Sequence, residues 1–109
     1  MNQPLLIKEA ILRHAGYLFC VRPGDITGPD RSRLFTPARF AVCRALRNRG
    51  WSYGKIGRLL NRDHTTIINA CDRADYMESK DPEYAAKVKE LTELQVLAPK
   101  ELRNVVDIA

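Results

Sequence analysis

The sequence contains no run of about 18 apolar residues, so none of its segments is predicted to span a membrane. Its N-terminal region is apolar only in patches, because Lys8, Glu9, Arg13 and His14 interrupt it, and it lacks the continuous hydrophobic region of a signal peptide. Strand-like alternation, internal repeats and low-complexity segments are also missing. These absences predict a helical protein that stays in the cytoplasm, without a membrane partner.

Cysteine is scarce, and the three that occur, Cys20, Cys43 and Cys71, include no C-x-x-C pair of the kind that zinc sites use. His14 and His64 are not spaced as a ligand pair either. We therefore predict no metal and no other cofactor, and we interpret the cysteines as buried free thiols. Because the sequence also has no nucleophile–base motif and no paired-carboxylate signal, we predict that it is not an enzyme.

Charge of both signs is present but unevenly distributed. The 109 residues have a net charge of +5, and residues 31–73 alone hold ten Lys or Arg against two Asp. Residues 1–30 are neutral, whereas residues 74–109 are net acidic. A basic segment of this size suits a polyanionic partner such as nucleic acid, although a solvated basic face has the same composition. Charge alone leaves both interpretations open.

Apolar residues at three-to-four spacing predict an all-α fold, a helix-turn-helix bundle of about five to six helices. The first predicted helix covers about residues 4–17, and a loop rich in proline and glycine follows at 23–29. A second helix is predicted to begin with Thr36 as its N-cap and Pro37 in its first position, and to end near Gly50.

A short helix capped by Ser52, a turn at 61–63 and a further helix over about 64–78 have the form of a helix-turn-helix. In that motif the second helix enters the major groove of DNA with its N-terminal end first. Many ordinary helix pairs share this outline, so the residues at the start of the second helix have to decide its function.

A last amphipathic helix is predicted from Asp81-Pro82. We therefore divide the chain into a DNA-binding domain, residues 1–80, and a C-terminal helical extension, residues 81–109, which packs on that domain or projects from it. If the extension projects, an alternative function is that of a protein-interaction adaptor, binding a second copy of the chain or another protein through its acidic amphipathic helix.

Two sequence motifs lie in the predicted helix-turn-helix: residues 62–70 read RDHTTIINA and residues 52–57 read SYGKIG. Upstream, Arg31-Ser32-Arg33 and Arg39 form a basic stretch around the start of the second helix. Over about residues 11–75 the chain resembles the C-terminal DNA-binding domain of DnaA, the bacterial replication initiator family, whose signature is R-D-H-T-T-(V/I)-x-x-A. The resemblance implies a Trp-repressor-like helix-turn-helix that binds duplex DNA at DnaA boxes of TTATNCACA type and regulates replication initiation or transcription.

The residues at the start of the recognition helix have chemistry that suits DNA contact, since a helix N-terminus attracts phosphate. His64 and Thr66 can hydrogen-bond to phosphate oxygens, and Thr65 can meet a thymine methyl group or a base edge. Asp63 can accept from a cytosine amine, and Arg39 has the reach and the fork for a guanine. Simpler readings remain open: Asp63 as a helix N-cap, and His64 and Thr66 as ordinary first-turn residues.

The resemblance further implies that Arg31 enters an adjacent minor groove, where narrow A·T-rich sequence attracts arginine. The remaining members of the predicted DNA-binding set are Arg33, Lys55, Arg62, Asn69 and Arg73.

The sequence departs from the family at several places. Phe40 stands where the family commonly has a phosphate-contacting glutamine, and Asp72 stands at a helix position that is often basic. No phosphate-binding loop of the form G-x-x-x-x-G-K-[ST] occurs, so ATP binding is not predicted, and the chain is expected to act without the ATPase domain of the initiator. In addition, Asn61 alone precedes the signature Arg62, where the family usually has two glycines.

Overall fold

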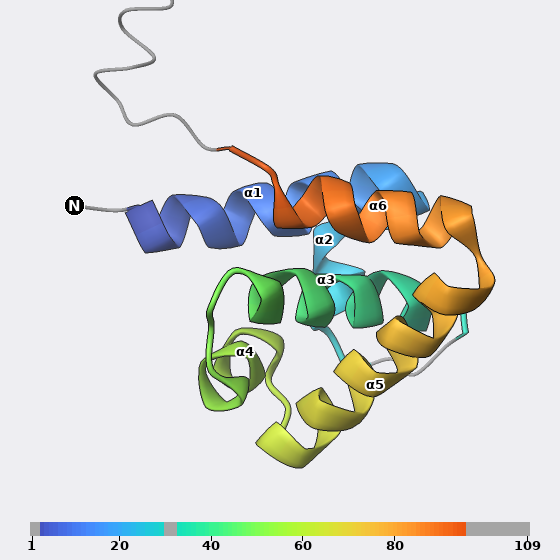
Figure 1. The fold of residues 1–109 in the computed structure, drawn as a ribbon. Helices are drawn as coiled ribbons and strands as arrows, with labels where there is room; N and C mark the ends of the chain where they lie inside the picture. Colours follow the sequence, from blue (N-terminus) through green and yellow to red (C-terminus); the bar gives the residue numbers. More distant parts are fainter. Residues whose placement is uncertain (1–2, 30–32, 96–109) are drawn as a thin grey trace, which may run out of the picture.

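The computed structural model describes residues 3–29 and 33–95 and contains, in that part of the chain, six helices and no strand (Figure 1). The prediction of an all-α helix-turn-helix bundle is confirmed. The elements are α1 (Gln3–Phe19), α2 (Pro23–Thr27), α3 (Thr36–Asn48), α4 (Tyr53–Leu60), α5 (His64–Lys80) and α6 (Pro82–Thr92). None of the described helices is long and apolar enough to cross a membrane.

Helix α3 is the centre of the bundle, and it contacts α1, α2, α4, α5 and α6. Figure 1 shows α1 and α6 side by side along one side of α3, with α4 and α5 along the other. Ala38, Ala41 and Ala45 are fully buried on α3, and their small side chains let neighbouring helices approach closely. Leu46 of α3 and Ile67 of α5 are also fully buried, and each such side chain contributes about 1.5–3 kcal/mol through removal from water.

Helix α6 contributes to the same core through Tyr84, Val88 and Leu91, which are buried. The Tyr84 hydroxyl donates a hydrogen bond of 2.7 Å to the Pro37 carbonyl oxygen, and burial raises the pKa of this phenol. Its ring also meets that of Phe19 edge-on, at a centroid distance of 5.7 Å. The first part of the predicted C-terminal extension is therefore packed on the bundle, whereas residues 96–109 lie outside the described residues.

Residues 23–27 form the short helix α2, where a loop was predicted. Its signals were present in the sequence: Pro23 occupies the first turn, and the Asp25 carboxylate accepts from the Arg22 backbone N–H at 3.1 Å. A carboxylate three residues into a helix satisfies a backbone donor that has no partner within the helix. The N-cap of α3 also differs from the prediction by one residue, since it is Phe35 and Thr36 is already helical.

Tertiary contacts decide the exposure of two further side chains. Arg44 is partly buried and hydrogen-bonds to Asp75 at 3.3 Å and to Glu78 at 3.2 Å. Cys20, expected to be buried, is exposed, with a positive φ of 59° after the end of α1. Cys43 and Cys71 are buried free thiols, as predicted.

Candidate nucleic-acid interface

Helix α4, the first helix of the motif, is capped by hydrogen bonds at both ends. The Ser52 hydroxyl caps α4 by accepting from the Lys55 backbone N–H at 3.1 Å, as predicted. At the other end Asn61 adopts a left-handed conformation, with φ 58° and ψ 48°, which asparagine tolerates better than most residues. The Arg62 N–H then donates to the Gly57 carbonyl oxygen at 2.8 Å, so the single asparagine reverses the chain without a glycine pair.

Gly57 is required by the closeness of this turn. A Cβ atom placed on Gly57 would lie 2.4 Å from the Arg62 carbonyl oxygen, nearer than non-bonded atoms can approach. The turn between α4 and α5, residues 61–63, is called the recognition turn below. It packs directly on the backbone of α4.

The first turn of α5 begins with a side-chain cap. Asp63 Oδ1 accepts from the Thr66 backbone N–H at 2.9 Å, so the N-cap reading of Asp63 is confirmed. Hydrogen bonding from Thr66, first by its backbone N–H and then by its hydroxyl, lowers the pKa of the Asp63 carboxyl below its usual value. His64, Thr65 and Thr66 are all exposed, so the end of the helix that would enter a groove presents polar side chains to solvent.

Beyond this turn, α5 has one buried face and one exposed polar face. Thr65, Asn69 and Arg73 are exposed and four residues apart, so they form a row along the helix. The opposite face holds the buried residues Ile67, Ala70, Cys71 and Ala74. The helix is thus held in the bundle by one face while the row from Thr65 to Arg73 is available to a partner.

Arg39 is in a different position from the one predicted for a guanine-reading residue. Its side chain is only 5% exposed, and its guanidinium donates to the carbonyl oxygens of Ile26 and Asp25, each at 2.7 Å. The helical spacing gave a signal for this burial, since Arg39 precedes the buried Val42 and Leu46 by three and seven residues. We correct the assignment: Arg39 holds α2 against α3.

The other predicted basic residues lie in three settings. Arg33 is exposed in the turn before α3, and Arg31 lies outside the described residues. Lys55 is half-buried with its Nζ 4.2 Å from the centre of the Trp51 ring. Arg62 is half-buried and hydrogen-bonds to backbone carbonyl oxygens.

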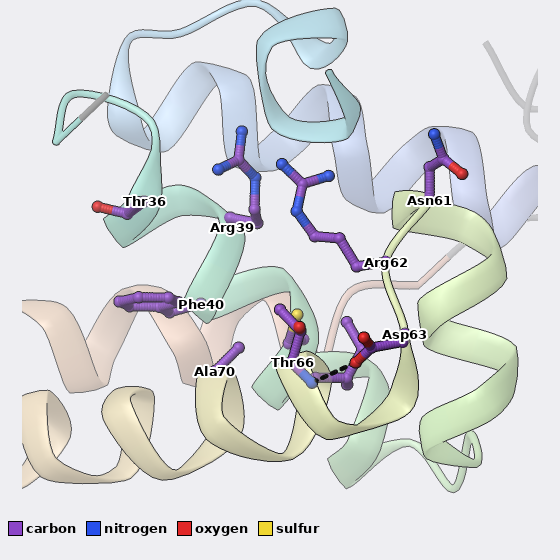
Figure 2. A pocket seen from close by; sticks show the side chains of 10 residues that line it. Thr36, Arg39, Phe40, Asn61, Arg62, Asp63, Thr66 and Ala70 are labelled. Carbon is purple, nitrogen blue, oxygen red and sulfur yellow. Dashed lines mark hydrogen bonds between the residues drawn. The ribbon is translucent and has the colours of Figure 1, made fainter. Parts of the chain in front are cut away.

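A pocket of about 540 Å³ lies between the start of α3 and the start of α5, and sequence reasoning did not find it (Figure 2). Thr36 and Phe40 line it from α3, and Asp63 and Thr66 line it from the start of α5. Its lining residues come from segments far apart in the sequence, so no local sequence signal reveals it. Among the described residues no group of three or more His, Cys, Asp or Glu side chains could hold a metal ion.

The cap at Asp63 leads to a pH prediction. Because the folded-state pKa of Asp63 is lowered, its contribution to stability is present above the unfolded-state pKa of about 4 and is lost as pH falls through the lower folded-state pKa. Asp63→Asn keeps a capping oxygen but does not titrate. The difference in thermal midpoint between wild type and Asp63→Asn should therefore be constant from pH 7 to about pH 4. Below about pH 4 the midpoint of the wild type should fall relative to that of Asp63→Asn. A constant difference down to pH 2.5 would contradict this role.

These features define a DNA-binding module of the helix-turn-helix class. They are a short helix, a tight turn and a second helix with an exposed polar first turn, all within a basic segment. Residues 7–74 match the family model described as bacterial DnaA protein helix-turn-helix, and the chain belongs to this family. The resemblance stated from the signature residues is confirmed.

Curated relatives agree with this assignment. The chain is 30% identical over 88 residues to the chromosomal replication initiator protein DnaA of Acinetobacter baylyi, and equally to that of Acinetobacter baumannii strain AYE. The matched region covers 79% of this chain and 19% of each relative, so the chain spans about a fifth of the length of these initiators.

Proposed function

We propose that the protein binds duplex DNA sequence-specifically at sites of the DnaA-box type, and that it thereby regulates replication initiation or transcription at the nucleoid. The observation that carries this proposal is the start of α5, where His64, Thr65 and Thr66 are exposed on a helix whose opposite face is buried. No catalytic reaction is part of the proposal.

In the proposed complex α5 enters the major groove with Thr65 and Asn69 toward base edges. His64 and Thr66 lie at the positively polarised end of the helix and bind phosphate oxygens there. Arg33 is exposed in the turn before α3 and is assigned to the neighbouring minor groove or its phosphates.

The test is a binding titration with two duplexes of equal length and composition, one carrying a TTATNCACA element and one with that element scrambled. We expect preferential binding of the first by at least about a hundredfold and a steep loss of affinity for both as salt rises. Equal affinity for both duplexes at every salt concentration would leave a non-specific binder and refute the sequence-specific function.

Thr65 is predicted to read a base. Thr65→Ala should weaken binding to the preferred duplex by about 1–3 kcal/mol and leave binding to the scrambled duplex nearly unchanged, because only the base contact is lost. Ser79→Ala, an exposed position near the other end of α5, is the matched control and should change neither affinity. Equal losses on the two duplexes for Thr65→Ala would show that Thr65 contacts the backbone.

A further inference from the structure

Two arginines from different parts of the chain bind the end of α2. Arg39, in the first turn of α3, donates to the carbonyl oxygens of Asp25 and Ile26, and more weakly to that of Gly28 at 3.4 Å. Arg62, at the recognition turn, donates through Nη2 to the same Gly28 oxygen at 2.7 Å. Figure 2 shows the two guanidinium groups side by side at one edge of the pocket, directed away from Thr66.

Arg62 also donates through Nη1 to the Leu60 carbonyl oxygen at 2.6 Å. Leu60 is the last residue of α4, and Gly28 is the residue that caps α2, so one planar group joins the C-terminal ends of two helices. The carbonyl groups at such ends carry partial negative charge and lack partners within their helices, which favours a cation there. A lysine ammonium keeps the charge but lacks the rigid fork that reaches two acceptors at once.

These contacts lie directly before the recognition helix. Arg62 precedes Asp63, the cap of α5, so its backbone moves with that helix. Arg39 in turn holds Asp25 and Ile26 of α2 to α3. Loss of the Arg62 contacts would therefore release the start of α5 from the ends of α2 and α4.

We propose that Arg62 is a positioning residue, which holds the first turn of α5 in place by binding the Gly28 and Leu60 carbonyl oxygens. The inference rests on the proposed function, in which that turn contacts the duplex. It replaces the prediction that Arg62 contacts DNA directly. Since its described hydrogen bonds are made to the protein's own backbone, Arg62 acts on DNA through the segments that it holds.

The charge-preserving variant Arg62→Lys separates the two roles. A phosphate contact survives exchange of one cation for another, whereas a two-acceptor bridge does not. We expect Arg62→Lys to lower affinity for the duplex that carries the TTATNCACA element, the box duplex, by about tenfold. The effect on the scrambled duplex should be smaller. Arg58→Lys is the matched control, because Arg58 is exposed on α4, and it should stay within about twofold of wild type. Wild-type affinity in Arg62→Lys would overturn the proposal.

Amide hydrogen exchange without DNA tests the positioning separately from DNA binding. The Gly28 N–H donates to the Gly24 carbonyl oxygen at 2.9 Å, and the distant Trp51 N–H donates to that of Leu46 at 3.1 Å. Arg62→Lys should speed exchange at Gly28 by about tenfold and leave Trp51 unchanged. An equal rise at both amides would mark general destabilisation and overturn the proposal. If the wild type does not prefer the box duplex over the scrambled one, the proposed function is refuted. The exchange rate at Gly28 would still test the positioning role of Arg62 in that case.

Discussion

Replacement of Gly57 by alanine should destabilise the protein by about 2 kcal/mol and displace the recognition turn. The added Cβ would lie 2.4 Å from the Arg62 carbonyl oxygen, and this obstacle is backbone that cannot rotate away. Overpacking of this kind costs about 1–3 kcal/mol, which outweighs the higher helix propensity of alanine. Thermal unfolding should show a midpoint lower by about 10 °C. Binding to the box duplex should fall by more than about tenfold, because Asp63 and Thr65 move with the turn.

Gly54→Ala is the matched control for this variant. Gly54 lies in the same helix, and a Cβ placed there meets nothing within 4 Å. This substitution should be neutral or stabilise by up to about 1 kcal/mol, since alanine is the better helix former. If Gly57→Ala and Gly54→Ala shift the unfolding midpoint alike, the close contact at Gly57 does not determine the turn.

Arg39→Ala should have the larger effect on stability, with a loss of about 3–4 kcal/mol. The substitution removes a buried guanidinium and leaves the carbonyl oxygens of Asp25 and Ile26 without this donor, and hydrogen bonds to charged groups are worth about 1.5–3 kcal/mol each. Chemical denaturation should show the loss as a lower midpoint with an unchanged slope. In DNA titrations, corrected for the folded fraction, the variant should bind both duplexes more weakly.

Arg47→Ala, on the same helix, is the control for loss of an arginine. Arg47 is exposed, and it donates to the Trp51 carbonyl oxygen and lies over the Tyr53 ring, so its removal should cost about 1 kcal/mol or less. The original assignment of Arg39 as a guanine reader would regain support from one result: a variant of wild-type stability that loses only the preference for the box duplex.

The recognition turn shows what local sequence can predict. Ser52 was identified as a cap and Asp63 as a possible cap, because the side chains of such residues bond to backbone N–H groups three residues away. The exposure of Thr65 and Asn69 followed from helical spacing against the buried Ile67. Such interactions depend on residues within one or two turns, so the sequence contains all the partners involved.

The arginines show where local reasoning stops. Arg39, Arg44 and Arg62 are similar in sequence, each a basic residue in a basic segment, and Arg39 and Arg62 were predicted to contact DNA. Their actual partners are up to 34 residues away, as with Gly28 for Arg62 and Glu78 for Arg44. Which carbonyl or carboxylate an arginine meets depends on how helices pack, and a long flexible side chain reaches acceptors in several directions.

The sequence by itself determined the helical class, the helix-turn-helix, the family and the polar first turn of α5, because periodicity, caps and a contiguous signature are local properties. Only the tertiary structure decided that Gly57 lies against the recognition turn, that Arg39 is buried, and that Arg62 joins α2 to α4. These outcomes depend on the close packing of α2, α3 and α4, which brings distant backbone acceptors within reach of each guanidinium.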